Sequence, residues 1–356
     1  MLKTHFFMNL FQLSESFQTE TEVTDYFEYV RWGKKAHCSH CGSDKISKRY
    51  TNFRYHCTDC RNRFSVTTGT QLENTNLSLR KWLMSFALIV NAKKGISALQ
   101  LKRDIGVSYE TAWTMYHKIR TFMNDGEIKL KGIIEADETY IGSKPRKYQS
   151  AKFPNHNEFQ HEYLDRKLDK LGDKHIFSNP NAYKKKGLLE NAPRGRGTVK
   201  TPIVGMVQRN GNVVAEVMLT TDFKHIKQMA EQYIKMSDSV LLTDEFSAYS
   251  RFDAIIEHIK IDHSKMYSYK GLNTNSIESF WAIIKRGIMG QYHHVSDKHL
   301  PNYIDEFCFK YNNRKYDDMF ETLVFNSMLP PDFTSKDVDS KMINVRMGKK
   351  RARNVA

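Results

Sequence analysis

Four of the five cysteines in this sequence lie within 23 residues, as two Cys-x-x-Cys pairs separated by fifteen residues. Each pair presents two thiolates on a tight turn, and two pairs at this spacing can close a tetrahedral all-sulfur site that suits Zn²⁺. Because four thiolates leave no open coordination position, the zinc ion is predicted to be structural. The predicted ligands are Cys38, Cys41, Cys57 and Cys60.

The alternative arrangement of these cysteines is a pair of disulfide bonds. Residues 1–17 show no basic segment leading into an apolar stretch, so we expect no secretory signal and a compartment that keeps thiols reduced. Cys308 lies alone in an apolar pattern and is expected to be a small core residue. The histidines beside the pairs are expected at the surface and not as ligands: His37, His40 and His56.

Three acidic residues stand where carboxylates can converge. Asp137 and Asp244 are each expected to end a short apolar strand, and Glu278 lies on a helix expected over about 275–286. Such carboxylates can hold two divalent metal ions, which activate the attacking oxygen and stabilise the leaving oxygen of a phosphodiester. Hard oxygen ligands favour Mg²⁺ or Mn²⁺ over the zinc of the cysteine site.

Each of these acids also has an ordinary structural interpretation. Asp at a strand end often caps or makes a turn, and Glu on a helix is usually solvated. Their order favours the metal site, because strand, hairpin, helix, strand and helix in succession is the element order of a ribonuclease-H-like domain. Glu135 is an alternative to Asp137, since residues two apart on a strand share a face.

Basic residues on the same helix strengthen this interpretation. Lys285 follows Glu278 by seven residues, or two helical turns, so both project from one face. A lysine beside metal-binding carboxylates can contact phosphate as a point charge. Arg286 is expected as a further DNA contact, and Asn275 lies on a neighbouring part of the face.

Residues 95–120 predict a helix-turn-helix. Ser97 and Ser108 can each cap a helix, Gly106 lies in the turn, and Trp113 is expected on the buried face of the second helix. Two packed core helices with polar outer faces are the alternative; the neighbouring cysteine site and the net charge of +15 favour DNA binding. The side chains expected to face DNA are Tyr109, Thr111, Thr114 and Lys118, with Glu110 and His117 beside them.

The charge balance favours a polyanionic partner. The pI is near 9.4, the mean hydropathy is −0.60, and the longest clean apolar run, 86–90, is far too short to span a membrane. Residues 143–200 carry 14 Lys or Arg against six Asp or Glu and read as a basic insertion. This insertion is expected to make sequence-independent phosphate contacts through Lys184, Lys185 and Lys186.

Three stretches resemble the catalytic blocks of bacterial insertion-sequence transposases related to the eukaryotic Merlin elements. Residues 292–300 and 306–314 are similar to that family's next block, and Arg31-Trp32-Gly33 introduces a similar zinc ribbon. The three stretches are Ile134-Glu-Ala-Asp-Glu-Thr-Tyr-Ile-Gly142, Leu242-Thr-Asp-Glu-Phe-Ser-Ala-Tyr249 and Asn273-Thr-Asn-Ser-Ile-Glu-Ser-Phe-Trp-Ala-Ile-Ile-Lys-Arg-Gly-Ile-Met-Gly290.

The resemblance implies a DDE enzyme in which three acids bind metal and Lys285 contacts DNA: Asp137, Asp244 and Glu278. Some relatives place Asn where others place the third Glu, so Asn275 is an alternative third ligand. The resemblance implies nothing about the role of the 143–200 insertion.

We therefore expect an α/β, multi-domain chain. A zinc ribbon (1–70) and a helix-turn-helix domain (71–126) precede a ribonuclease-H-like mixed-sheet domain (127–330), which contains the insertion, and a basic tail (331–356) follows. The expected protein is cytoplasmic, bacterial and nucleoid-associated, and acts on double-stranded DNA as a homodimer or higher oligomer.

The primary functional hypothesis is a transposase that binds the terminal inverted repeats of its element, cleaves DNA and joins the 3′ hydroxyl to target DNA. The alternative is a DNA-binding regulator whose transposase-like domain is inactive; the intact acids Asp137, Asp244 and Glu278 argue against it. A third possibility is an enzyme of the same fold that cuts RNA or branched DNA. The sequence-specific module and the family blocks argue against that enzyme.

Overall fold

The computed structural model describes residues 10–123, 128–142, 200–218, 220–244, 247–261, 273–316 and 318–331. The expected insertion, apart from Lys200, and the tail after residue 331 lie outside the described residues, as do Lys184, Lys185 and Lys186. The chain forms two compact units, called unit 1 (Met1–Ile128 with Asp305–Ala356) and unit 2 (Lys129–Ile304). None of the helices in the described ranges is long and apolar enough to cross a membrane.

Unit 1 begins with helices α1 (Leu10–Ser16) and α2 (Glu20–Trp32), followed by the short antiparallel strands β1 (Arg54–His56) and β2 (Arg63–Ser65). Thr19 and Glu22 form a capping box at the start of α2, which satisfies two backbone N–H groups of the first turn. The two-stranded ribbon packs its inward residues around the cysteines, with Tyr55 stacked on Phe64. A small cysteine-centred core thus follows α1 and α2 in unit 1.

The further helices described wholly within unit 1 are α3 (Leu79–Asn91), α4 (Ala98–Ile105), α5 (Tyr109–Phe122) and α11 (Met319–Ser327). Ser97 caps α4 and Ser108 caps α5, each accepting a hydrogen bond from a backbone N–H three residues later. Gly106 ends α4 in the left-handed region with φ 63°, as a turn between the two helices requires. The predicted helix pair is therefore present. The expectation that Trp113 lies on the buried face of α5 is wrong. Its side chain is 39% exposed, and its ring centroid lies 4.2 Å from that of His117.

Residues of α11 and the C-terminal half of α10 (Leu300–Asn313) pack within unit 1. Gln71 donates its backbone N–H to the carbonyl of Leu329, and α11 contacts α2, α3 and α5. Residues 305–330, which the sequence assigned to the catalytic domain, cluster with the N-terminal helices of unit 1. The expected domain limit at residue 330 stays a prediction.

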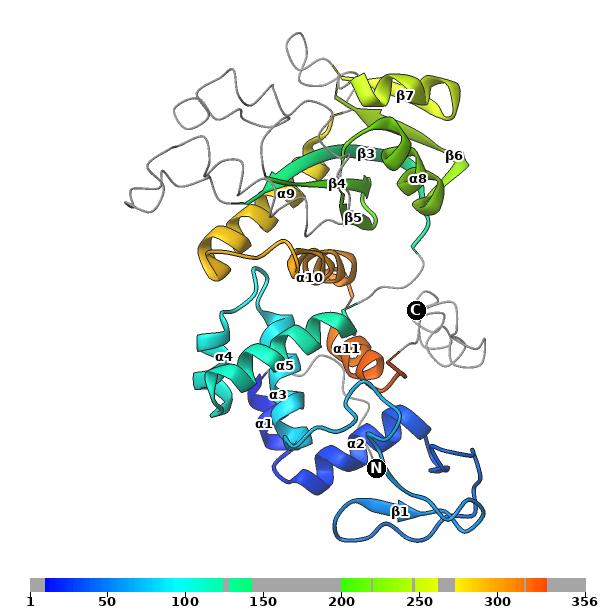
Figure 1. The fold of residues 1–356 in the computed structure, drawn as a ribbon, viewed down its shortest axis with the longest axis vertical. Helices are drawn as coiled ribbons and strands as arrows, with labels where there is room; N and C mark the ends of the chain where they lie inside the picture. The colour runs from blue at the N-terminus through cyan, green and yellow to red at the C-terminus, as the bar shows by residue number, and fades with distance from the viewer. Residues whose placement is uncertain are drawn as a thin grey trace, which may run out of the picture. The chain divides into compact units, whose positions relative to one another are not determined.

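Unit 2 is built on a five-stranded mixed sheet with the order β5-β4-β3-β6-β7 (Figure 1). β3 pairs antiparallel with β4, and β4 with β5, while β6 and β7 run parallel to β3. The β4–β5 hairpin turns at Asn210, with φ 59°, and Gly211, as the Asn-Gly pair predicts. The strands are β3 (Leu130–Ile141), β4 (Thr201–Gln208), β5 (Val213–Val217), β6 (Ile234–Thr243) and β7 (Glu257–Lys260).

Helical segments cover both faces of this sheet. Asp137 hydrogen-bonds Trp281 of α9 (Asn275–Gly287), whereas its neighbour Glu138 accepts a hydrogen bond from Tyr249 of the 3₁₀ segment η1 (Ser247–Ala254). Since successive strand residues point to opposite faces, α9 and η1 lie on opposite sides of β3. α8 (Phe223–Tyr233) packs against η1, and a π-helical turn, η2 (Ile288–Tyr292), follows α9.

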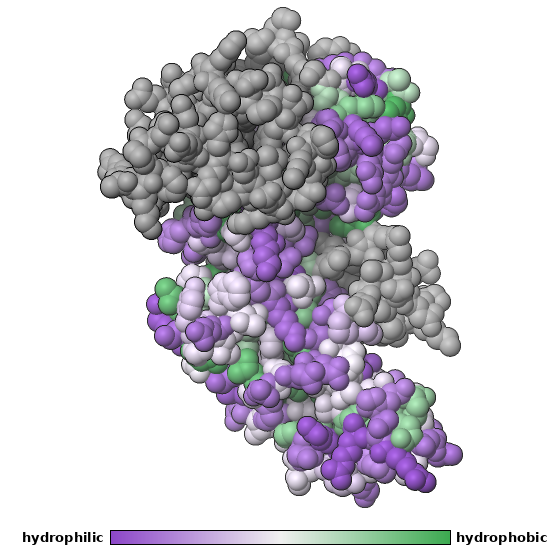
Figure 2. Space-filling model, in the orientation of Figure 1, coloured by the Kyte–Doolittle hydropathy of each residue, from purple (hydrophilic) through white to green (hydrophobic). Residues whose placement is uncertain are grey.

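The predicted class is confirmed: a mixed α/β, multi-domain chain with a cysteine-centred ribbon at its N-terminal end. In unit 2 the predicted elements occur in the predicted order: a strand with Asp137, a hairpin, a helix, a strand followed by Asp244, and a helix with Glu278. Between the last two lie η1 and the short strand β7, which the sequence did not predict. On the face of the molecule in Figure 2, the described surface is mostly hydrophilic, in keeping with the charge-rich composition.

Candidate metal centres and active site

The four cysteines converge on one point in unit 1. The Sγ atoms of Cys38 and Cys60 lie 3.6 Å apart, those of Cys41 and Cys57 lie 3.7 Å apart, and all four sulfurs lie within 4.8 Å of one another. Four sulfurs at about 2.3 Å from a tetrahedral zinc ion would be separated by about 3.8 Å. A disulfide needs about 2.0 Å, and all four side chains are free thiols. The thiols therefore fit a structural zinc ion and are not paired as disulfides.

The local chain holds these thiols in place. Gly42 has φ 74° directly after the first pair, a left-handed conformation that favours glycine. The guanidinium of Arg31 donates hydrogen bonds to the carbonyls of Val66 and Thr68 at 2.6 and 2.7 Å, which ties α2 to the end of the ribbon. The neighbouring histidines lie outside the sulfur cluster: His37 and His40 are exposed, and His56 is half-buried.

In unit 2 the strand register brings Asp137 and Asp244 together. Glu135 of β3 is opposite Leu242 of β6 in a parallel pair, so two residues further along the strands Asp137 faces Asp244. β6 ends at Thr243, as predicted. β3 does not end at Asp137, contrary to expectation, because β4 continues to pair with it as far as Ile141.

Glu138 joins the two aspartates, and oxygen atoms of the three carboxylates lie within 4.8 Å of one another. Burial, with added repulsion from Glu138 and Asp244, raises the pKa of Asp137 to about 7. Three neighbouring carboxylates repel one another when they are ionised, and a divalent cation would offset this repulsion. Their oxygen atoms are ligands that suit Mg²⁺ or Mn²⁺. Glu138 was not expected at this site, because alternation along a strand predicts that adjacent side chains point to opposite faces. Its carboxylate nevertheless comes within 4.8 Å of that of Asp137, and its position next to Asp137 was the available signal.

α9 also reaches this cluster. Trp281, 3% exposed, donates its indole N–H to Oδ2 of Asp137 at 3.1 Å. Its ring lies over Gly205, the residue paired with Asp137 on β4, and a Cβ at Gly205 would lie 2.6 Å from the ring. The missing side chain at Gly205 thus gives Trp281 access to the aspartate.

Glu278 and Lys285 occupy different surroundings on α9. Lys285 lines a cavity of about 850 Å³ together with Asp137, Glu138 and His293 of the segment after η2. Glu278 is exposed, lies outside the cluster of three carboxylates, and accepts a hydrogen bond from the Thr274 hydroxyl at 3.1 Å. The structure therefore brings Asp137 and Asp244 together and places Lys285 on the wall of a cavity that Asp137 also lines. The assignment of Glu278 as third ligand stays a prediction.

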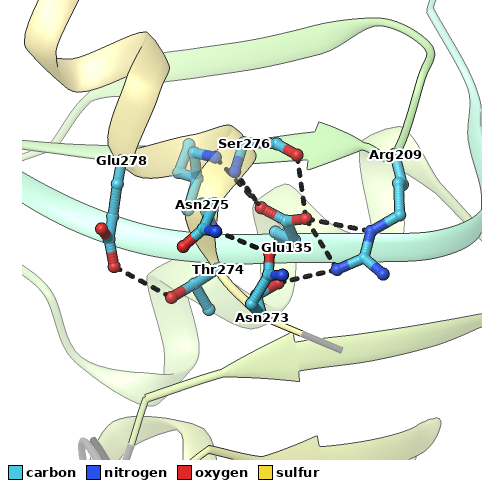
Figure 3. Close-up of polar contacts among 8 residues, drawn as sticks. Glu135, Arg209, Asn273, Thr274, Asn275, Ser276 and Glu278 are labelled. Carbon is cyan, nitrogen blue, oxygen red and sulfur yellow. Dashed lines mark hydrogen bonds and ion pairs between the residues drawn. The ribbon is translucent and has the colours of Figure 1, made fainter. Parts of the chain in front are cut away.

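The two alternatives from the sequence have other contacts. Glu135 is fully buried and accepts hydrogen bonds from Arg209 and from the first turn of α9 (Figure 3). Asn275 is exposed, and its backbone N–H donates to Oδ1 of Asn273 at 3.2 Å. Glu135 does not belong to the cluster of Asp137, Glu138 and Asp244.

The residues expected to face DNA in unit 1 lie on α5. Tyr109 and Thr114 are exposed, while Thr111 and Lys118 are partly exposed. Partial burial lowers the pKa of Lys118. Arg286 of unit 2 is exposed and donates to the carbonyl of Ala282.

Comparison with known proteins identifies two domains. Residues 18–63 match the transposase zinc-ribbon domain, and residues 173–312 match the ISXO2-like transposase domain. The second match contains Asp244, Glu278 and Lys285 and begins inside the stretch expected as a basic insertion; Asp137 precedes it. These matches confirm the resemblance to insertion-sequence transposases.

The chain is also similar to an uncharacterized protein in transposable element ISH50 of Halobacterium salinarum, with 28% identity over 131 residues. The aligned region covers 36% of this chain and 44% of that relative, so the chain spans less than half the length of the relative it matches.

Proposed function

We propose that this chain, which carries a transposase zinc ribbon and an ISXO2-like transposase domain, is a DDE transposase that cleaves DNA at the ends of its mobile element and joins them to target DNA. The observation that carries the proposal is the convergence of Asp137 and Asp244 beside a cavity lined by Lys285. The order of elements in unit 2 supports a ribonuclease-H-like catalytic domain.

Asp137 and Asp244 would hold divalent metal ions through carboxylate oxygens, with Glu278 of α9 as the proposed third ligand. Such ions, when bound, activate an attacking oxygen and stabilise the leaving oxygen at phosphorus. Trp281 fixes one oxygen of Asp137 through its indole N–H and so limits the orientations of that carboxylate. Lys285, on the cavity wall, can contact a DNA phosphate next to the acids.

Recognition of the element ends is assigned to unit 1. The α4–α5 pair has the two serine caps and the glycine turn of a helix-turn-helix, and α5 exposes Tyr109 and Thr114. The cysteine cluster supports a structural zinc ion that holds the ribbon. Alignment of two ends for joining implies a dimer or higher assembly.

The proposal is tested with DNA carrying the element's terminal repeats, full-length protein and Mg²⁺ or Mn²⁺. Asp137→Asn and Asp244→Asn should each lower cleavage and strand joining by several orders of magnitude, and the double variant should be no worse, because the ligands act as one unit. End binding should survive in each variant. Full activity in both single variants would refute the proposed enzymatic function and favour the alternative, a DNA-binding regulator.

A further inference from the structure

The N-terminus of α9 is capped by a side chain from another element (Figure 3). Oε2 of Glu135, on β3, accepts hydrogen bonds from the backbone N–H groups of Ser276 at 2.8 Å and Ile277 at 3.1 Å. These are the second and third residues of the helix, whose N–H groups an N-cap side chain ordinarily satisfies. The negative charge of Glu135 also interacts favourably with the positive end of the helix dipole.

The residue at the N-cap position has a different role. Thr274, 3% exposed, makes no side-chain cap hydrogen bond and instead donates its hydroxyl to Oε1 of Glu278 at 3.1 Å. Because Glu135 accepts from the first-turn N–H groups, the Thr274 hydroxyl is directed to the carboxylate one turn later. The cap that Glu135 makes on α9 thus leaves the Thr274 hydroxyl to hold Glu278.

The same helix sets the geometry of Asp137. Trp281 lies seven residues, or about two helical turns, after Thr274 and donates to Asp137, which is two residues after Glu135 on β3. α9 is therefore attached to one face of β3 at two points, the Glu135 cap and the Trp281–Asp137 hydrogen bond. A shift of the helix along the strand would change both contacts together.

We propose that Glu135 is a positioning residue that docks α9 on β3 and so orients Glu278 and Asp137 for a divalent cation. This inference rests on the proposed function, which supplies the metal site. Glu135 is not assigned as a ligand, because its two oxygens already accept five hydrogen bonds, two from Ser276, one from Ile277 and two from Arg209. Arg209 also donates to the carbonyl of Asn273 at 2.8 Å, which extends the clamp to the residue before the cap.

Mn²⁺ binding to the full-length protein tests this role, with free Mn²⁺ followed by electron paramagnetic resonance at a temperature well below unfolding. Glu135→Gln keeps the size of the side chain but removes its charge and one acceptor oxygen. We expect it to weaken Mn²⁺ affinity about tenfold, as loss of a residue that orients metal ligands commonly does. Thr274→Val, which leaves the cap intact, should weaken the affinity by a smaller factor through Glu278 alone.

The matched control is Glu216→Gln, a partly buried glutamate of β5 that accepts a hydrogen bond from Tyr233 away from the carboxylate cluster. It should leave Mn²⁺ affinity within about twofold of wild type, since it orients no metal ligand. As a second measurement, the indole N–H resonance of Trp281 should shift in Glu135→Gln and stay in place in Glu216→Gln. If Glu135 served stability alone, Glu135→Gln would change the melting temperature and leave both the Mn²⁺ affinity and the Trp281 resonance unchanged.

The outcomes separate the two levels of the proposal. Wild-type protein that binds no Mn²⁺ overturns the proposed function and this inference with it. Wild-type protein that binds Mn²⁺, with unchanged affinity in Glu135→Gln and Thr274→Val, overturns the inference alone. Loss of a whole bound ion in Glu135→Gln, with Thr274→Val unaffected, would make Glu135 a ligand and also overturn its positioning role. If Glu135→Gln does not fold, Thr274→Val still decides whether the capped turn orients the site.

Discussion

Glu306 of unit 1 and Asp137 of unit 2 lie in opposite electrostatic surroundings. In unit 1, Glu306 is fully buried and accepts hydrogen bonds from Arg120 at 2.8 Å, Lys310 at 2.6 Å and Tyr116 at 2.8 Å. Burial alone would raise the pKa of Glu306, but the positive charges of Lys310 and Arg120 lower it to about 2. This carboxylate is ionised and compensated by cations of the same chain.

In unit 2, Asp137 lies beside two further acids. Burial, then the charges of Glu138 and Asp244, raise the pKa of Asp137 to about 7. A fold can stabilise a buried carboxylate with its own cations, as at Glu306, or gather acids whose ionised forms disfavour one another. The second arrangement favours binding of an external cation, and this contrast supports the metal site proposed for unit 2.

The largest expected effect is the loss of DNA cleavage when the third metal-binding carboxylate is replaced. With Asp137→Asn as reference, Glu278→Gln should lower DNA cleavage by a similar several orders of magnitude, because a missing ligand disables the whole unit. Glu138→Gln should retain measurable cleavage, as should Asn275→Ala. The measurement is cleavage of end-containing DNA at saturating Mn²⁺.

The reverse result would revise the site. An active Glu278→Gln beside an inactive Glu138→Gln would make Glu138 the third ligand, in agreement with its closeness to Asp137 and Asp244. An inactive Asn275→Ala beside an active Glu278→Gln would transfer the role to Asn275.

These two sites also show what the sequence could predict. The four cysteines were found from spacing alone, because both pairs are local turns joined by a short ribbon. Asp137 and Asp244 could be placed together because parallel neighbouring strands fix their register. The cap of Glu135 on α9 could not, since it depends on how a helix more than 130 residues away in the chain docks on β3. Glu138 was not expected, because strand alternation predicts that it points away from Asp137.

Trp113 illustrates the same limit on a smaller scale. Its helical spacing predicted a buried residue, yet it lies on the exposed side of α5 next to His117. Apolar periodicity identifies the helix but does not specify where its buried stripe ends. The caps of α4 and α5 were predictable, because a capping side chain interacts within three residues of itself.

A second prediction separates the metal centre of unit 1 from that of unit 2. Cys57→Ser should lose about one zinc ion per chain and expose the ribbon to proteolysis, since zinc binding there is largely folding free energy. Mn²⁺ affinity should stay near that of wild type, because the carboxylate cluster uses no residue of the ribbon. Elemental analysis and limited proteolysis give the first result, and the Mn²⁺ titration gives the second.

Cys308→Ser is the control, because Cys308 is buried in α10 and lies outside the sulfur cluster. It should keep its zinc. Stoichiometric zinc in Cys57→Ser would refute the assignment of the four cysteines.

The smallest expected effect is a pH dependence of stability that differs in sign between Asp137 and Glu306. The folded-state pKa of Asp137 is raised from 3.8 to about 7, so folding disfavours its ionised form and this group should stabilise the protein as pH falls from about 7 toward 3.8. The folded-state pKa of Glu306 is lowered from 4.5 to about 2, so its contribution to stability is present above pH 4.5 and is lost as pH falls toward 2.

Thermal unfolding without added divalent metal tests both signs. The melting temperatures of wild type and Asp137→Asn should differ by a few degrees at pH 7, and this difference should narrow by pH 5. Glu306→Gln should be less stable than wild type at pH 7, and that difference should narrow only below about pH 4.5. Differences between variant and wild type are used because zinc thiolates also protonate in acid. If the Asp137→Asn difference were the same at pH 7 and pH 5, the acidic cluster would carry no excess repulsion, and the contrast between the two units would fail.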